Sequence, residues 1–399
     1  MVNNNDKKVL NVPALRFPEF SGEWKHVHLK EIAEFQKQRI STALLNNNNY
    51  ISTENILQDF EGIQCSSSMP ANVNVIKYQN EDILLSNIRP YLKKVWFADR
   101  KGGCSADVLV LRGNKCDKYF LYYVIASDRF INYVMSGIKG VKMPRGDKNQ
   151  MEEYAFSIPT NMEQKRIAKF ISILDERIRL QNKIIEKYES LIQAIIYQKK
   201  TDGIRKGNWQ KTELSKVLQE RTEKNINGYT VCSVSVSQGI INQIEYLGRS
   251  FAAKETSHYN VVKYGDIVYT KSPTGDFPYG IVKRSYIKNA VAVSPLYGVY
   301  KPIDDNIGVI LHFYFMQPNN AFNYLHPLIQ KGAKNTINIT NTRFLENSIP
   351  LPKTEDEAVY IANALTRIQT KIDIEKSLLR SYEREKQYLL RQMLYKQLT

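Results

Sequence analysis

Four loops of the chain combine basic, amide and aromatic side chains with glycine or proline, a pattern suited to contact with nucleic acid. Glycine lets a loop approach a phosphate backbone, lysine and arginine neutralise its charge, and arginine, asparagine or lysine can read base edges in the major groove. The first half has two such loops, residues 86–97 and 137–150, with the candidate contacts Arg89, Tyr91, Lys93, Lys94, Lys139, Lys142 and Arg145. The second half has residues 269–280 and 330–343, with Lys271, Thr274, Asp276, Tyr279, Lys331, Lys334 and Asn335. Basic loops at matching places in both halves predict two contacts with nucleic acid.

The charge of the whole chain favours the same class of partner. The formal net charge is +16 and the isoelectric point is about 9.4. In a cytosolic protein the usual partner for such a charge is a nucleic acid. The first residues, MVNNNDKKVLNV, lack the apolar core of a signal peptide, and no stretch reaches the roughly 18 apolar residues of a membrane span. We therefore expect a cytoplasmic protein that binds nucleic acid.

Motifs for catalysis or cofactor binding are not found in the sequence. The segment GDFPYG, residues 275–280, has the glycine spacing of a P-loop, but Ile281 and Val282 stand where lysine and a hydroxyl residue would meet phosphate and Mg²⁺. Neither a G-x-G-x-x-G loop nor the Asn/Asp-Pro-Pro-aromatic tetrapeptide of amino-methyltransferases occurs. The five histidines are scattered, and the four cysteines have no C-x-x-C spacing. We expect no catalytic residues, metal or cofactor in this chain.

Two long helices must position these loops. Thr160 with Glu163, and Thr354 with Glu357, have the spacing of a capping box, so a helix is predicted to follow each pair. In both helices apolar residues recur at alternating steps of four and three, the 3.5-residue period of a coiled-coil seam. The seam positions are Ile167, Ile171, Leu174, Ile178, Gln181, Ile185 and Tyr188 in the first copy and Ile361, Leu365, Ile368, Ile372, Glu375, Leu379 and Tyr382 in the second. Each copy has its polar residue, glutamine or glutamate, at the same place.

The repeat extends beyond the helices to most of the chain. Gly22, Trp24 and Leu29 reappear, with the same spacing, as Gly207, Trp209 and Leu214. In each half, short β-rich runs are followed by a helical stretch, near residues 118–136 in the first and 308–330 in the second. The sequence therefore predicts an α+β fold: a tandem duplication of a mixed α/β domain followed by a long helix.

The expected boundaries follow from these landmarks. They are a first recognition domain at 1–160, a central long helix at 161–200, a linker at 201–208, a second recognition domain at 209–352 and a C-terminal long helix at 353–399. The linker is expected because residues 199–208, KKTDGIRKGN, combine glycine with polar residues.

Two motifs carry a resemblance to a known family. LRFPEFSGEW at residues 15–24, and the pattern P-x-x-x-E-Q-K-R-I-A-x-F-I-S-x-L-D-E-R-I at residues 159–178, resemble the DNA-specificity (S) subunit of type I restriction-modification systems. The duplication of a long helix after each variable domain belongs to the same resemblance. The second helix departs from the pattern, because Ala358, Val359 and Tyr360 replace Gln-Lys-Arg, and Gln369, Thr370 and Lys371 replace Asp-Glu-Arg.

The resemblance implies a non-catalytic subunit that reads a bipartite, asymmetric site in double-stranded DNA with two target-recognition domains, each a mixed α/β domain followed by a long helix. The two long helices would pair as an antiparallel coiled coil that sets the gap between the half-sites. It also implies docking to two methyltransferase (M) subunits and, in the full complex, to restriction (R) subunits. S-adenosylmethionine, ATP and Mg²⁺ would belong to those partners. Two alternatives remain open: a structural coiled-coil adaptor without DNA contact, and the recognition subunit of a type II-like methylase-nuclease.

Overall fold

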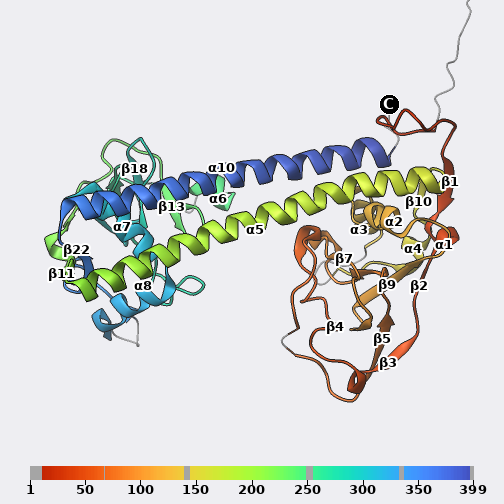
Figure 1. Ribbon diagram of the computed structural model, residues 1–399, viewed down its shortest axis with the longest axis horizontal. Coiled ribbons are helices and arrows are strands. Elements are labelled where there is room, and N and C mark those ends of the chain that lie inside the picture. Colours follow the sequence, from red (N-terminus) through yellow and green to blue (C-terminus); the bar gives the residue numbers. More distant parts are fainter. Residues whose placement is uncertain (1–10, 67, 139–143, 249–254, 332–336, 396–399) are drawn as a thin grey trace, which may run out of the picture. The chain divides into compact units, whose positions relative to one another are not determined.

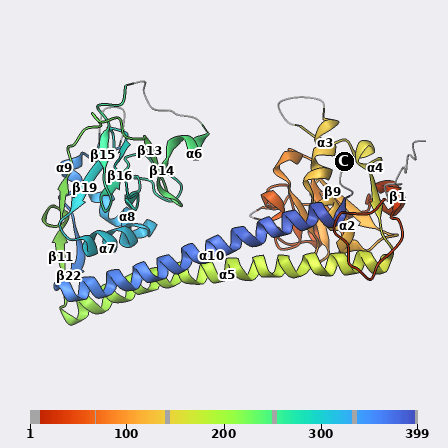
Figure 2. The same ribbon diagram turned by 90° about the horizontal axis from the view of Figure 1, so that it is seen from above.

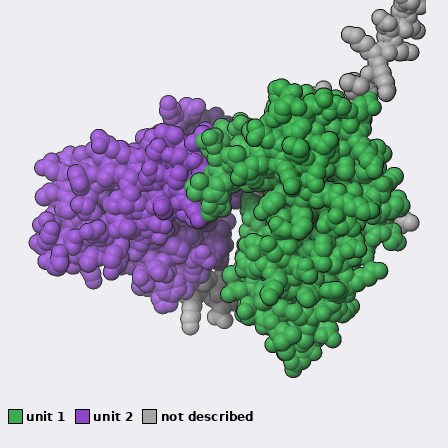
Figure 3. All heavy atoms as spheres, turned by 45° about the vertical axis from the view of Figure 1, so that its right-hand side comes forward, with its two compact units in different colours: residues 1–180, 379–399 green, residues 181–378 purple. Residues whose placement is uncertain are grey.

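The computed structural model describes residues 11–66, 68–138, 144–248, 255–331 and 337–395. The chain forms two compact units, the first made of residues 1–180 and 379–399 and the second of residues 181–378 (Figures 1 and 3). Two long helices, α5 (Asn161–Lys206) and α10 (Glu355–Leu394), contribute a segment to each unit. They contain 46 and 40 residues, so each is far longer than an ordinary globular helix.

Two four-stranded sheets form the framework of the first unit. One has the order β2-β9-β6-β7 with antiparallel neighbours, and the other has the order β3-β5-β8-β4, in which β4 and β8 run parallel. A separate antiparallel pair joins β1 to β10, the strand before α5. The bounds are β1 Lys25–His28, β2 Ala33–Phe35, β3 Arg39–Ser41, β4 Tyr50–Ile51, β5 Asn74–Tyr78, β6 Ile83–Ser86, β7 Val95–Phe97, β8 Gly102–Cys104, β9 Val108–Gly113 and β10 Ala155–Ile158.

The central strand β6 supplies side chains to two clusters of buried residues. Ile83 and Leu85 belong to one cluster with helical residues such as Phe120, whereas Leu84 belongs to the other with Tyr78 of the second sheet. Successive residues of a strand point to opposite faces, so an all-apolar strand of this kind is covered on both sides. The helices of this unit are α1 Leu29–Ile32, α2 Lys118–Ile125, α3 Asp128–Ser136 and α4 Lys148–Glu152, with 3₁₀ turns η1 Thr42–Leu44, η2 Gln58–Phe60 and η3 Pro90–Leu92.

The second unit repeats this organisation. Its four-stranded antiparallel sheet has the order β12-β19-β16-β17, and β11 pairs with β22, the strand before α10, as β1 pairs with β10. Further pairs are β13 with β14, β15 with β18 and β20 with β21. The strands are β11 Trp209–Glu213, β12 Leu218–Glu220, β13 Cys232–Ser235, β14 Gly239–Asn242, β15 Asn260–Val262, β16 Ile267–Tyr269, β17 Val282–Arg284, β18 Val291–Val293, β19 Gly298–Pro302, β20 Gln330–Lys331, β21 Ile337–Asn338 and β22 Ser348–Pro352. The helices are α6 Gln243–Leu247, α7 Asp305–Phe315, α8 Pro318–Leu325 and α9 Asn341–Phe344, with η4 Leu214–Lys216 and η5 His326–Leu328.

The two predicted helical stretches are each broken once. In the first unit α2 ends before Ser127, whose hydroxyl accepts a hydrogen bond from the backbone N–H of Phe130 in the first turn of α3. In the second unit Pro318 stands at the start of α8, where it has no N–H to give to a continuing helix. Capping by serine and proline therefore turns each stretch into two short helices.

The segments of α5 and α10 lie side by side within each unit and run antiparallel (Figures 1 and 2). In the first unit Lys386 Nζ lies 2.5 Å from Asp175 Oδ1, and in the second Lys376 Nζ lies 2.7 Å from Glu189 Oε1. Later residues of α5 thus meet earlier residues of α10. The antiparallel coiled-coil pairing is as predicted, because apolar positions repeated every 3.5 residues keep one stripe against the partner helix.

The linker expected at residues 201–208 is wrong over most of its length, because α5 continues to Lys206. Gly203 allows this continuation rather than ending the helix. A Cβ atom on Gly203 would lie 2.0 Å from Cδ1 of Trp209, so the missing side chain makes room for the indole against the last turns of α5. The turn itself falls at Gly207, which has a φ of +76°.

Candidate DNA interface and helix pair

Three loops of the first unit come together around the connection between β6 and β7. The backbone N–H of Arg89 donates to the carbonyl of Pro144 at 2.8 Å, and that of Asn87 donates to the carbonyl of Asp107 at 2.8 Å. Arg89 has a φ of +51°, in the left-handed region, which turns the loop back on itself. The two loops predicted separately, residues 86–97 and 137–150, are therefore neighbours in space where the structure describes them.

The candidate residues of these loops differ in whether their side chains have hydrogen-bond or ion-pair partners. Arg89 and Tyr91 are exposed. Lys93 Nζ lies 2.9 Å from Asp128 Oδ1, and this hydrogen bond raises the pKa of Lys93. Lys94 Nζ donates to the carbonyl of Thr53 at 2.8 Å. Both lysines thus have partners inside the unit, and their use in DNA contact stays a prediction.

The other candidates of the first unit lie in the loop before α4. Arg145 is exposed, and its Nη2 lies 3.1 Å from Asp107 Oδ1. Lys139 and Lys142 lie outside the described residues.

In the second unit the loop of residues 270–280 packs against α8 and η5. The ring of Tyr279 lies 5.3 Å from that of Phe322 and 5.8 Å from that of His326. Thr274 and Asp276 are exposed at the tip of the loop, whereas Lys271 is half-buried. Burial lowers the pKa of Lys271.

The remaining candidates of the second unit follow η5 closely in the chain. Lys331 ends β20, but its side chain is outside the described atoms, as are Lys334 and Asn335 altogether.

The sequence did not lead us to predict a basic cavity in the first unit. This cavity has a volume of about 370 Å³ and is lined by Phe35, Gln36, Lys37, Arg39, Ile76, Leu109, Val110 and Lys148. Three of these residues are cationic and none is acidic. The signal that could have found it is Q-K-Q-R at residues 36–39, where the two cations share one face of an extended segment.

Each long helix begins beside a tryptophan that donates to a glutamate in its first turn. Trp24 Nε1 lies 3.3 Å from Glu163 Oε1, and Trp209 Nε1 lies 3.0 Å from Glu357 Oε1. These are the landmark tryptophans of the duplication. The repeat therefore preserves a bond between the start of the first strand of each unit, Trp24 just before β1 and Trp209 in β11, and the helix that closes the unit.

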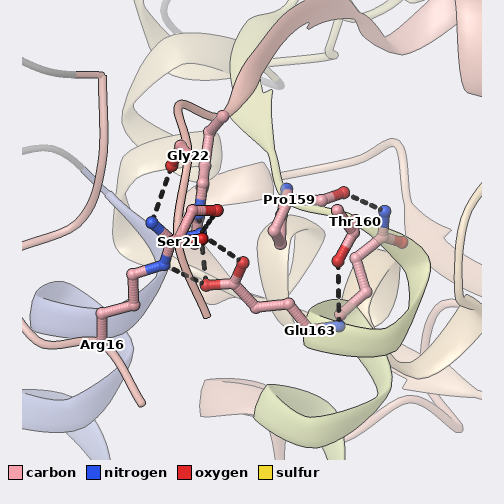
Figure 4. A network of polar contacts seen from close by, with 8 residues as sticks. Arg16, Ser21, Gly22, Pro159, Thr160 and Glu163 are labelled. Carbon is pink, nitrogen blue, oxygen red and sulfur yellow. Dashed lines mark hydrogen bonds and ion pairs between the residues drawn. The ribbon is translucent and has the colours of Figure 1, made fainter. Parts of the chain in front are cut away.

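Glu163 has a further partner that the sequence did not predict. Its carboxylate accepts two hydrogen bonds from Arg16, each of 2.7 Å, and its side chain is 1% exposed (Figure 4). The Thr160 hydroxyl accepts the N–H of Glu163 at 3.4 Å, which is one half of the expected capping box. The carboxylate faces Arg16 and Trp24 instead of closing the other half, because a buried carboxylate is stabilised far more by a guanidinium than by one backbone N–H.

The seam positions of α5 and α10 lie in the interface between the helices. Buried positions are Ile167, Ile171, Leu174, Gln181, Ile185, Ile361, Leu365, Ile372 and Glu375, and half-buried ones are Ile178, Tyr188, Ile368, Leu379 and Tyr382. The two polar positions meet, since Gln181 Nε2 donates to Glu375 Oε2 at 2.5 Å. Lys371 Nζ lies 2.7 Å from Glu375 Oε1, and the hydrogen bonds from Lys371 and Gln181 lower the pKa of Glu375.

A sequence model of the type I restriction modification DNA specificity domain matches the chain twice, over residues 21–190 and 209–384. The chain belongs to this family. Each match covers one recognition unit's strands and most of the long helix that follows them. The specificity-domain family thus accounts for both halves of the duplication.

Individual members of the family show the same relationship at low identity. The specificity subunit of the type I restriction enzyme EcoDI of Escherichia coli is 25% identical over 124 residues, which are 30% of this chain and 28% of that subunit. The specificity subunit of the type I restriction enzyme MjaVIII of Methanocaldococcus jannaschii is 26% identical over 217 residues, 52% of this chain and 48% of that subunit. The matches span less than half the length of either relative.

Solved structures of such proteins share the fold. The S subunit of a type I restriction-modification system from M. genitalium aligns over 97% of this chain and 100% of its own, with a TM-score of 0.59 and 13% identity. A chain from a structure of complex assembly and conformational transition in a type I system aligns over 94% and 98%, with a TM-score of 0.51 and 16% identity. At these identities the likeness concerns the fold.

One histidine of this specificity-domain protein lies in its core. His312 is buried, its Nδ1 accepts the N–H of Arg284 at 3.1 Å, and burial lowers its pKa to about 3. Within the described ranges, no three His, Cys, Asp or Glu side chains gather as a metal site would require. Over the same ranges, no helix is long and apolar enough to span a bilayer.

Proposed function

We propose that this protein is the sequence-specific DNA-recognition subunit of a type I restriction-modification complex, with one target-recognition domain in each unit. The observation that carries the proposal is that the specificity-domain family matches each half separately, and that each half has its own four-stranded sheet. Two separate cores with dissimilar loops suit two different half-sites, so the DNA site read is bipartite and asymmetric.

The proposal includes two methyltransferase subunits as partners, with restriction subunits in the full complex. An apolar stripe on α5 that is not used in the helix pair supports docking of another protein. Its members, each between 39% and 47% exposed, are Ile173, Leu180, Ile184 and Leu191. S-adenosylmethionine, ATP and Mg²⁺ act in those partners, and this chain is non-catalytic.

Methylation mapping of the host genome tests the function. We expect methylated adenines in a split motif in cells that have the protein and its partners, and loss of that motif when this chain alone is deleted. Restoration by the chain supplied in trans completes the test. If this chain were instead a structural adaptor without DNA contact, its replacement by another adaptor of equal affinity for the methyltransferase would leave the motif unchanged.

Domain exchange separates independent reading from a shared site. Replacement of residues 1–160 by the corresponding domain of a relative should change one half of the motif and leave the other half as it was. A change in both halves would contradict reading by separate domains.

A further inference from the structure

Cations in the first unit differ in whether they already have acidic partners. Lys93 and Arg145, two cations of the loops that meet at the β6–β7 connection, form ion pairs with Asp128 and Asp107. The three cations of the cavity described above, Lys37, Arg39 and Lys148, form no ion pair with any residue that the structure describes. A phosphate therefore meets three uncompensated cations together at the cavity, whereas the charges of Lys93 and Arg145 are each compensated by a carboxylate.

Local contacts hold the cavity cations in place without neutralising them. Lys148 Nζ lies 5.0 Å from the centroid of the Phe35 ring, an attraction that leaves the ammonium charge intact. Arg39 Nη1 donates to the carbonyl of Asn74 at 3.1 Å, which leaves the remaining N–H groups of the guanidinium free for a two-pronged contact with phosphate oxygens.

Two acidic residues, Asp147 and Glu34, are next to lining residues in the chain, and both accept hydrogen bonds. Asp147 Oδ1 accepts the N–H of Asn149 at 2.9 Å and so caps α4. Glu34 Oε1 accepts a hydrogen bond from Gln36 at 3.3 Å. Neither carboxylate is among the lining residues, so the cavity keeps a positive field.

The corresponding place in the second unit has fewer cations. Ala33 of β2 pairs with Gly113 of β9, and Leu218 of β12 pairs with Pro302 of β19. Because β2 and β12 hold the same place in their sheets, Ala33 and Leu218 are equivalent residues. Counting along from these residues puts Thr222 in the place of Lys37, and Lys224 in the place of Arg39. The first residues of α4 and α9 likewise equate Lys148 with Asn341.

These counterparts also form hydrogen bonds with other side chains of their own unit. Lys224 Nζ donates to Asn260 Oδ1 at 2.6 Å, and Asn341 Nδ2 donates to Glu220 Oε1 at 2.7 Å. Arg221, in the place of Gln36, is ion-paired with Asp266. Where the first unit has three cations without an ion pair, the second therefore has one. The duplication has therefore kept the scaffold here while changing its charge.

We propose that the cavity formed by Lys37, Arg39 and Lys148 is the phosphate-binding anchor of the first unit on duplex DNA, and that the second unit lacks an equivalent anchor. The inference rests on the proposed function and deepens it, because it names the group bound and the half of the protein that binds it. Backbone contacts of this kind fix the register of a protein on DNA without reading its sequence.

The test measures binding of the full chain to a random-sequence duplex of about 40 base pairs by fluorescence anisotropy at several KCl concentrations. Replacement of all three cations, as Lys37→Gln, Arg39→Gln and Lys148→Gln, should reduce the slope of log K against log salt by about 0.9 for each phosphate that the variant no longer neutralises. Single variants should each reduce it by up to one such step. A control variant, Lys165→Gln, Lys169→Gln and Lys187→Gln, removes equal charge from exposed positions of α5 and should leave the slope nearly unchanged.

Each outcome has a defined meaning. Salt-dependent binding by the native chain with an unchanged slope in the cavity variant overturns the anchor but not DNA recognition. Equal losses in the cavity and control variants would show an effect of net charge and also overturn it. Loss of binding to a fluorescent ATP analogue in the cavity variant, with the DNA slope unchanged, would assign the cavity to a free nucleotide. No salt-dependent binding by the native chain would contradict the proposed function itself, and thermal unfolding by circular dichroism checks that each variant is folded.

Discussion

Glu163 is a buried charged group that is held by specific partners. Its carboxylate is almost completely enclosed and accepts three hydrogen bonds, two from Arg16 and one from Trp24. Glu357, its counterpart, accepts from Trp209, and its side chain is less buried. The two glutamates occupy equivalent positions in the duplication but have unequal surroundings, so their replacement should have unequal effects.

Glu163→Gln should lower the free energy of unfolding by about 3 kcal/mol, since it leaves the Arg16 charge without its partner. Glu357→Gln should lower it by about 1 kcal/mol, because the hydrogen bond from the Trp209 N–H to a carboxylate is weakened but no cation is left unpaired. Urea unfolding followed by tryptophan fluorescence measures both. The double variant Arg16→Met with Glu163→Gln should recover part of the loss, and no recovery would contradict the ion pair as the cause.

His312 should make the stability of the second unit depend on pH. Its pKa is about 3 in the folded chain, well below the ordinary value of 6.5, so the unfolded chain binds the extra proton between those values. Stability from this group is full above pH 6.5 and falls as pH decreases towards 3, by up to about 1.4 kcal/mol per pH unit. We expect about 1 kcal/mol less stability at pH 5.5 than at pH 7.

The measurement is the difference in unfolding free energy between pH 7 and pH 5.5. It should shrink in His312→Gln, which keeps an acceptor for the N–H of Arg284 but does not titrate. His258→Gln, at an exposed histidine, should keep the native pH dependence. If His312→Gln retained the full dependence, another group would be responsible.

The paired helices are the element that the sequence predicted most fully. Their seam and the start of α5 at Asn161 follow from apolar periodicity and from Thr160, because both signals are local to the helix. Their antiparallel direction came from the family resemblance, because a 3.5-residue period is the same for either direction. Arg16 as a partner for Glu163 could not be predicted, since the two are 147 residues apart in the chain. The end of α5 was misplaced for a similar reason, because the indole that fills the space at Gly203 belongs to the next strand.

The recognition units were less predictable than the helices. Short strands such as β5 and β9 were visible as β-branched runs, but the order β2-β9-β6-β7 depends on pairing between distant segments. The cavity at Lys37 and Arg39 likewise needs α4 to bring Lys148 beside β2. Candidate cations could be selected by composition, but their internal partners, as at Lys93 and Lys94, depend on the folded arrangement.

The Gln181–Glu375 pair should give the helix pair a lower free energy of unfolding than an apolar pair would. It should also restrict the registers and partner helices with which each long helix can pair. Gln181→Leu alone should lower the free energy of unfolding by about 1 to 2 kcal/mol, because it removes a hydrogen bond from a charged group. The double variant Gln181→Leu with Glu375→Leu should be at least as stable as the native chain, and part of it should elute as a dimer, because an unbroken apolar seam accepts other registers and partners. A strictly monomeric double variant on size-exclusion chromatography would contradict the role of this pair in pairing specificity.

At the scale of the whole molecule, both long helices pass from one unit into the other. If they set the spacing between the half-sites, one heptad inserted after Leu180 and another after Leu378 should lengthen the motif's spacer by about three base pairs. Seven helical residues add about 10.5 Å, and B-DNA rises about 3.4 Å per base pair. Methylation mapping reads the spacer directly, and both half-sites should be unchanged.

A heptad inserted in α5 alone is the matched control. It shifts one seam against the other and should destabilise the pair, with loss of methylation rather than a longer spacer. Methylation of the original motif by the paired insertion would assign the spacing to a part of the protein other than these helices.

Gln181 and Glu375 are equivalent residues of the two repeats, and they bond to each other across the helix pair. Where two identical helices cross antiparallel on a twofold axis, each residue on that axis meets its own copy, so an amide would face an amide and a carboxylate would face a carboxylate. A single chain with two copies of the helix is free of this identity. It can place a donor on one copy and a charged acceptor on the other, which two separate identical chains cannot do. Fusion of the repeats thus permits a lock between unlike side chains at the one place where symmetry would otherwise require like to meet like.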